Sequence, residues 1–171
     1  ISKIVVPIAK DETGGTLFDK LAEAGAKLLV ETLPHIFDGT AVYEKQPEES
    51  PTPYAGMITK QMGLINFGKS AAELERLVRG LNPWPSAFTF WNGKTLKVWE
   101  SFVVKSEEAG TEKPEPGTVV KTDKKGIYVA CGEDVLVLSQ VQLEGKKRMD
   151  ADAFLRGCHI ETGSRFTDKK E

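Results

Sequence analysis

Two short runs of basic residues are the part of this sequence best suited to bind a partner that carries phosphate groups. The six cations fall in two predicted turns, and they are Lys121, Lys124, Lys125, Lys146, Lys147 and Arg148. Clustered cations displace the counterions condensed on a nucleic acid, and this release favours binding. The whole chain has a net charge of −2, so composition alone favours the plainer alternative, that both runs are solvated surface turns.

Residues of the types that catalyse reactions or bind metals occur singly. His35 and His159 lack a second His or Cys at ligand spacing, which argues against a metal site. Cys131 and Cys158 lack the pairing of a zinc site or a disulfide framework, which favours a reducing cytoplasm. Cys158 adjoins His159, but neighbouring side chains on an extended segment point apart. Residues 13–16 lack the lysine of a phosphate-binding loop, so we interpret them as a helix cap.

The first half of the chain predicts one strand and one long helix. Residues 1–8 are typical of a strand, and we interpret the chain as a fragment of a larger protein, the alternative being a native mature terminus. Apolar residues at helical spacing predict a helix that begins near Thr16, packs one face, and kinks or ends at Pro34. Residues 44–53 are proline-rich and predict a linker, and residues 54–58 predict a helical turn.

The second half predicts a capped helix and then a series of short strands. Ser70 and Glu73 have the spacing of a capping box, and the prolines that follow Asn82 end the helix. A period of two residues then predicts strands, which are 87–91, 95–104, 118–120, 127–130 and 135–143. Short strands at this spacing favour a small antiparallel barrel. We also expect an acidic loop over 107–115, a short helix over 149–155 and a frayed tail from Thr167.

Aromatic side chains gather on the first two of these strands and just before them. They are Trp84, Phe88, Phe90, Trp91, Trp99 and Phe102. On an exposed barrel face such rings would be platforms for stacking bases, but in a domain of this size they more often fill the core. No apolar run approaches the length of about 18 residues that a membrane-spanning helix needs.

The segment between the helix and the strands resembles the domain junction of methionyl-tRNA formyltransferases. Its most specific residues are Arg79, Asn82, Pro83, Trp84 and Pro85. Short matches to the family continue in order along nearly the whole chain, among them Gly145 to Met149 and Phe154 to Gly157. Two positions depart from the family pattern, Asn66-Phe67 and Cys158-His159.

The resemblance implies an α+β fragment, made of the end of a Rossmann-like formyltransferase domain followed by an OB-like antiparallel barrel. The implied parts are 1–40, the remnant of the first domain; 41–82, a linker and helix; 83–166, the barrel; and 167–171, a tail. The catalytic Asn, His and Asp of the family are expected to precede Ile1, so this chain alone is expected to be inactive. Its incomplete first domain is expected to be mobile or to associate with another chain.

The implied reaction moves a formyl group from 10-formyltetrahydrofolate to the amino group of methionyl initiator tRNA at the start of translation. This chain would bind no cofactor and no metal, and its six cations and barrel would position the tRNA. Two alternatives remain open from the sequence. In the first, the parent is another enzyme of the formyltransferase family that acts on an amino-sugar or hydrolyses formyltetrahydrofolate. In the second, the chain is a stand-alone binding module.

Overall fold

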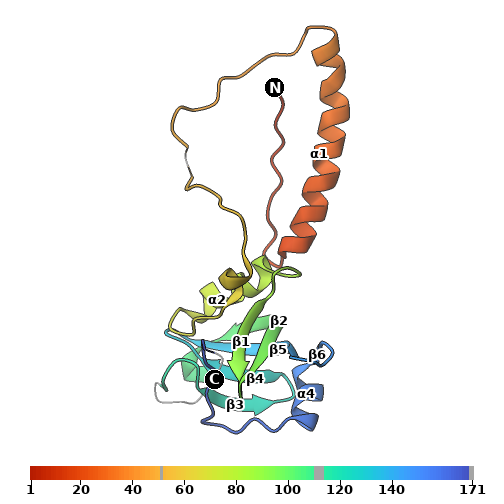
Figure 1. Cartoon of the computed structure of the whole chain (residues 1–171). Helices are drawn as coiled ribbons and strands as arrows, with labels where there is room; N and C mark the ends of the chain where they lie inside the picture. The colour runs from red at the N-terminus through yellow and green to blue at the C-terminus, as the bar shows by residue number, and fades with distance from the viewer. Residues whose placement is uncertain (51, 110–113, 170–171) are drawn as a thin grey trace. The chain divides into compact units, whose positions relative to one another are not determined.

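The computed structural model describes residues 1–50, 52–109 and 114–169. The chain forms two compact units, Ile1–Ile58 and Thr59–Glu171, which are described separately below. Figure 1 labels the helices and strands of both.

The first unit is built around one long helix, α1 (Gly14–Phe37). Thr13 caps its start, because the Thr13 hydroxyl accepts a hydrogen bond from the Thr16 N–H and the Thr16 hydroxyl accepts one from the Thr13 N–H. The helix therefore begins two residues before the predicted position. It also continues through Pro34 for one more turn, which is tolerated because Pro34 lies near the end of the helix.

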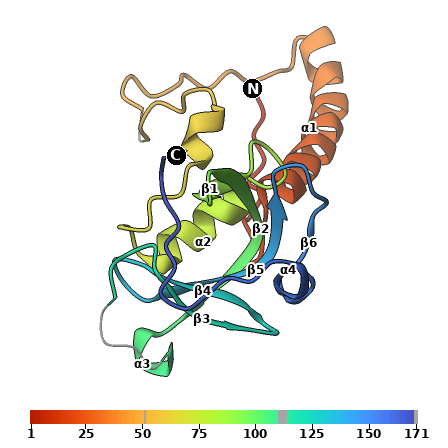
Figure 2. The same cartoon turned by 60° about the horizontal axis from the view of Figure 1, so that its bottom comes forward.

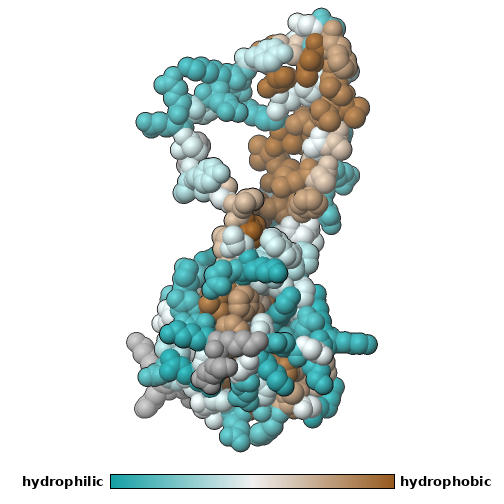
Figure 3. Space-filling view, in the orientation of Figure 1, coloured by the Kyte–Doolittle hydropathy of each residue, from teal (hydrophilic) through white to brown (hydrophobic). Residues whose placement is uncertain are grey.

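The apolar stripe of α1 is present as predicted, but its own unit covers it only in part. No residue of α1 is buried. Its exposed large apolar side chains include Phe18, Leu21, Leu29, Val30 and Phe37. Figure 3 shows this apolar surface as a brown band along the helix. The prediction that one face of this helix packs is therefore met only in part among the described residues of Ile1–Ile58, where Leu17, Ala24, Leu28 and Leu33 are half-buried.

Two predictions for this half of the chain are wrong. Residues 1–8 form no strand, because a strand requires backbone partners and none of the described residues pairs with this segment. Side chains hold it instead, with the Lys3 ammonium 2.9 Å from the Glu44 carboxylate. Residues 54–58 form no helical turn; a short 3-10 helix, η1 (Lys60–Gly63), follows them in the second unit.

The second unit contains a six-stranded sheet whose ladders are all antiparallel. Its strands are β1 (Ala87–Trp91), β2 (Lys94–Val104), β3 (Val119–Asp123), β4 (Gly126–Ala130), β5 (Val135–Leu143) and β6 (Met149–Asp150). The order across the sheet is β1-β2-β5-β4-β3, and β6 pairs with β5. The predicted antiparallel strands are thus confirmed, and β5 lies at the centre.

The C-terminal segment pairs with both outer strands of this sheet. Phe90 in β1 and Thr167 exchange two backbone hydrogen bonds of 3.0 and 3.1 Å. On the other side, the Val119 N–H in β3 donates to the Ser164 carbonyl at 2.8 Å. The prediction that the tail frays from Thr167 is therefore wrong at that residue, because Phe90, far away in the sequence, holds its backbone.

Helices α2 (Ala71–Gly80) and α4 (Ala151–Gly157) pack on the core face of the sheet. Figure 2 shows α2 crossing the strands and α4 beside β6. The capping box predicted at Ser70 and Glu73 is confirmed. The helix predicted from Met149 begins two residues later, because Met149–Asp150 pairs with β5 as β6. A short helix, α3 (Ser106–Ala109), leads into the predicted acidic loop, whose residues 110–113 lie outside the described ones.

The core lies between these helices and the inner face of the sheet. Its largest fully buried side chains are Ile65, Leu74, Leu96, Ile127, Leu136 and Leu138. A smaller cluster lies on the other face of the sheet around Tyr128, Val135 and Val137. Of the predicted aromatic residues, Trp91 packs edge-on against Phe154, whereas Trp84 remains 59% exposed.

Candidate nucleic-acid interface

The sheet brings the two basic turns to the same end of the second unit. The β3–β4 turn lies just beyond the Ile127–Leu138 pair, and β5 continues from Leu138 to Leu143 before it enters the second turn. In Figure 1, β3 accordingly runs toward the side on which β6 and α4 lie. The β4–β5 turn, residues 131–134, is at the opposite end. The two runs of cations therefore belong to one end of the fold.

Lys121 is the cation of the first run that is most engaged within the protein. It lies opposite Tyr128 in the β3–β4 ladder, and its ammonium lies 4.8 Å from the centre of the tyrosine ring. The ammonium is also 2.8 Å from the Asp123 carboxylate, and this hydrogen bond raises the pKa of Lys121. Lys121 thus already has an anionic partner, which a phosphate would have to replace.

Lys124, Lys125, Lys146 and Lys147 have exposed side chains that make no ion pair within the described part of the chain. The first turn is shaped by the Asp123 carboxylate, which accepts a hydrogen bond of 2.8 Å from the Lys125 backbone N–H. These four ammonium groups are therefore exposed to water, and they extend from turns whose backbone is held by hydrogen bonds.

Arg148 differs from its two lysine neighbours because three side chains hold its guanidinium. The guanidinium carbon lies 4.6 Å from the centre of the Trp99 ring, and Nη2 is 3.1 Å from the Glu100 carboxylate. Its Nε donates to the side-chain oxygen of Gln140. The position of Arg148 on the outer face of β2 and β5 is consequently fixed before any ligand binds, and Glu100 is its ion-pair partner within the protein.

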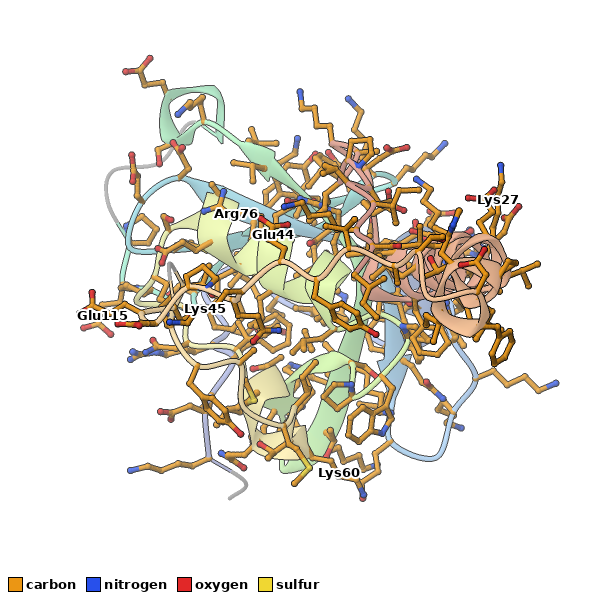
Figure 4. The ribbon with its side chains drawn as sticks, turned by 90° about the horizontal axis from the view of Figure 1, so that it is seen from above. Lys27, Glu44, Lys45, Lys60, Arg76 and Glu115 are labelled. Carbon is orange, nitrogen blue, oxygen red and sulfur yellow. The ribbon has the colours of Figure 1, made fainter. Side chains whose placement is uncertain are left out.

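Sequence reasoning missed Lys97, which lies on the same face. Its ammonium is 5.7 Å from the centre of the Trp99 ring and 3.5 Å from the Ser86 hydroxyl. The available signal was the alternation along this strand, in which Leu96 and Val98 are apolar and buried while Lys97 and Trp99 lie on the other face. Other cations are dispersed around the second unit; Figure 4 labels Lys60 on η1 and the exposed Arg76 on α2.

The predicted junction residues link α2 to β1 and β2. The Asn82 side-chain amide donates to the Trp99 carbonyl at 3.1 Å, and Arg79 pairs with Glu75 at 2.5 Å. The peptide bonds that precede Pro83 and Pro85 are both cis. The Ser86 hydroxyl donates to the Pro83 carbonyl at 3.3 Å. The junction therefore connects the helix to the strand that carries Lys97 and Trp99.

The surroundings of Cys131 do not favour a nucleophilic thiolate. Cys131 lies in the core, and burial raises the pKa of its thiol to about 12, since a thiolate there would lose its hydration. His159 is exposed, with Nε2 4.0 Å from the Glu161 carboxylate. Among the described residues there is no cluster of three or more His, Cys, Asp or Glu side chains able to hold a metal.

The helices within the described ranges are all too short or too polar to cross a membrane. His35, the other histidine of the chain, lies at the end of α1 with Nδ1 3.0 Å from the Thr40 hydroxyl.

Comparison with known proteins decides the family. Residues 57–159 match the family model described as "Formyl transferase, C-terminal domain". The chain belongs to the formyl transferase C-terminal domain family. The family model covers all six strands as well as α2 and α4, so the antiparallel sheet with helices is the fold of such a domain.

The formyl transferase relatives agree with the resemblance seen in the sequence, which is confirmed. The chain is 53% identical over 167 residues to the methionyl-tRNA formyltransferase of Agathobacter rectalis, a match that covers 98% of the chain and 52% of that protein. It is 46% identical over 164 residues to the Bacillus subtilis enzyme of the same name, covering 95% of the chain and 50% of that protein. The chain thus spans about half the length of these relatives.

Solved structures agree on the fold. Two crystal structures of HypX from Aquifex aeolicus, one of a variant and one of a complex with tetrahydrofolic acid, match with TM-scores of 0.59 and 0.60 and a sequence identity of 12% each. Each match covers 93% of the chain and about 30% of HypX (30% and 29%, respectively). At this identity the likeness concerns the fold of the formyl transferase domain alone.

Proposed function

We propose that this chain is the C-terminal half of a methionyl-tRNA formyltransferase and that its second unit docks the tRNA. The observation that carries the proposal is the 53% identity that extends over 98% of the chain to an enzyme of that name. The four exposed lysines at one end of the sheet support the docking role, because phosphate contacts orient a nucleic acid without taking part in chemistry.

The reaction itself would use groups outside this chain. Formyl transfer from 10-formyltetrahydrofolate requires a base or a positioned polar group to free the methionyl amine, and donors that stabilise the oxyanion formed at the carbonyl. The expected catalytic Asn, His and Asp precede Ile1 in this proposal, and the folate binds with them. The chain contributes by holding the aminoacyl end of a large substrate in reach of those groups, which lowers the entropic part of the barrier.

The finer architecture belongs to the same proposal. An OB-like barrel over residues 83–166 is supported by the C-terminal segment, which hydrogen-bonds to Phe90 on one outer strand and Val119 on the other. A Rossmann-like remnant over residues 1–40 is supported by the exposed apolar side chains of α1, among them Phe18, which is 72% exposed. Without the partner domain these side chains would also drive self-association of the chain. Because a tRNA substrate would be met in the cytoplasm, we expect the protein to act there.

Titration of the 171-residue chain with initiator tRNA at several salt concentrations tests the docking role. If Lys124, Lys125, Lys146 and Lys147 each neutralise one phosphate, log Kd should rise with log salt with a slope of about 3 to 4, so that affinity falls about 100-fold between 50 and 200 mM salt. Fluorescence anisotropy of labelled tRNA gives this slope. Absence of binding at 50 mM salt would contradict docking and favour an enzyme acting on an amino-sugar or on formyltetrahydrofolate.

A further inference from the structure

We propose that the outer face of β2 and β5 is a groove for the sugar–phosphate backbone of RNA, in which Lys97 contacts a phosphate and Trp99 and Gln142 position the cations. This inference rests on the proposed tRNA docking, and it extends the interface from the basic turns to a strand surface that the sequence did not indicate.

The face contains a surface depression next to the second basic turn. The depression has a volume of about 290 Å³ and lies between β2 and β5; its lining residues are Thr95, Lys97, Gln142, Leu143, Glu144 and Gly145. Gly145 adopts a positive φ of 78°, which turns the chain so that Lys146 and Lys147 follow directly at the rim. The depression and the turn are therefore parts of one surface.

Trp99 organises the cations of this surface. Its ring lies 5.7 Å from the Lys97 ammonium and 4.6 Å from the Arg148 guanidinium, so both cations rest near one aromatic side chain. The indole N–H donates to the Gln142 side-chain oxygen at 3.1 Å, which fixes the ring. Cations that are already ordered lose less side-chain entropy when a phosphate binds.

Gln142 links this ring to the basic turn. While its oxygen accepts from Trp99, its amide N–H donates to the Lys146 carbonyl at 3.0 Å. One side chain thus fixes both the aromatic ring that supports two cations and the backbone from which two more extend. Trp99 and Gln142 are positioning residues in this scheme, whereas Lys97, Lys146 and Lys147 make the contacts.

Glu100 is the feature that gives the proposal a distinctive consequence. Its carboxylate, 57% exposed, is 3.1 Å from Arg148 Nη2 and therefore occupies the place that a phosphate oxygen would take. RNA must displace Glu100 or share Arg148 with it. A neutral side chain at this position should consequently strengthen RNA binding, an effect that a loss of structure cannot produce.

The experiment measures initiator tRNA binding by the 171-residue chain at 50 mM salt in three variants. Lys97→Gln should weaken binding about tenfold and lower the salt slope by about 1, as expected for the loss of one phosphate contact. Glu100→Gln should tighten binding about threefold. Lys69→Gln is the control, because Lys69 contacts Gly132 at the opposite end of the sheet, and it should leave both values unchanged.

The outcomes separate this inference from the proposed function. If the unmodified chain binds tRNA but neither Lys97→Gln nor Glu100→Gln changes the affinity, the proposal of an RNA groove on β2 and β5 is wrong and the docking role stands. If the unmodified chain fails to bind tRNA, both are wrong. Circular dichroism of Lys97→Gln shows whether its loss of affinity reflects unfolding, and the gain expected for Glu100→Gln remains a test in either case.

Discussion

Replacing Lys146 and Lys147 together by alanine is expected to weaken tRNA binding about 100-fold at 50 mM salt, since each phosphate contact contributes about tenfold there through counterion release. The salt slope should fall by about 2. The fold should persist, because both side chains are exposed and make no ion pair in the described part of the chain. Anisotropy titrations at four or more salt concentrations measure both quantities.

The matched control changes the same two residues, Lys146 and Lys147, to arginine. Arginine keeps the positive charge, so the slope should stay near that of the unmodified chain if the contacts are to phosphates. A salt slope that remains unchanged in the alanine variant would remove these two residues from the interface. An equal loss of affinity in the arginine variant would mean that side-chain shape, rather than charge, governs binding at this turn.

Gly132→Ala is expected to cause the largest loss of stability, about 3 kcal/mol. A Cβ atom at Gly132 would lie 2.1 Å from the Gly68 carbonyl oxygen, a backbone atom that cannot rotate away. The Gly132 N–H also donates to the carbonyls of Phe67 and Lys69, both at 2.9 Å. The substitution would push apart the β4–β5 turn and the segment that leads into α2. Urea denaturation followed by tryptophan fluorescence measures the loss.

Gly80→Ala is the control for this substitution. Gly80 ends α2, and a Cβ atom there meets nothing within 4 Å. Alanine at this position should leave stability equal or raise it by about 0.5 kcal/mol, because alanine favours the helix more than glycine does. If Gly132→Ala proves as stable as Gly80→Ala, the close packing of the turn on the segment before α2 is wrong.

The elements that were predicted correctly are those set by local interactions. Ser70 and Glu73 lie three residues apart and satisfy each other's backbone N–H, so the start of α2 can be recognised within one turn of helix. Asn92 and Gly93 adopt φ values of 48° and 70°, which the hairpin requires and which these two residue types tolerate. Such signals need no knowledge of the rest of the chain.

The elements that were missed depend on partners distant in sequence. A strand at residues 1–8 failed because β-propensity supplies no neighbour, whereas Thr167 was held by Phe90, a residue that only the folded sheet brings near. At the site, the sequence identified the cations but could not show that Lys121 already forms an ion pair with Asp123, and Arg148 one with Glu100. Lys97 was missed because the alternation in β2 indicates that it faces away from the core but does not identify the residues of other segments that surround it.

The central claim is that this chain supplies the tRNA-docking half of a methionyl-tRNA formyltransferase. A chimera tests it most directly: the half of the Agathobacter rectalis enzyme that this chain does not match is fused ahead of it. With 10-formyltetrahydrofolate, the chimera should formylate methionyl initiator tRNA, and the other half alone should do so far more slowly. A folded chimera that forms no formylmethionyl-tRNA, while the parent enzyme does, would contradict the account.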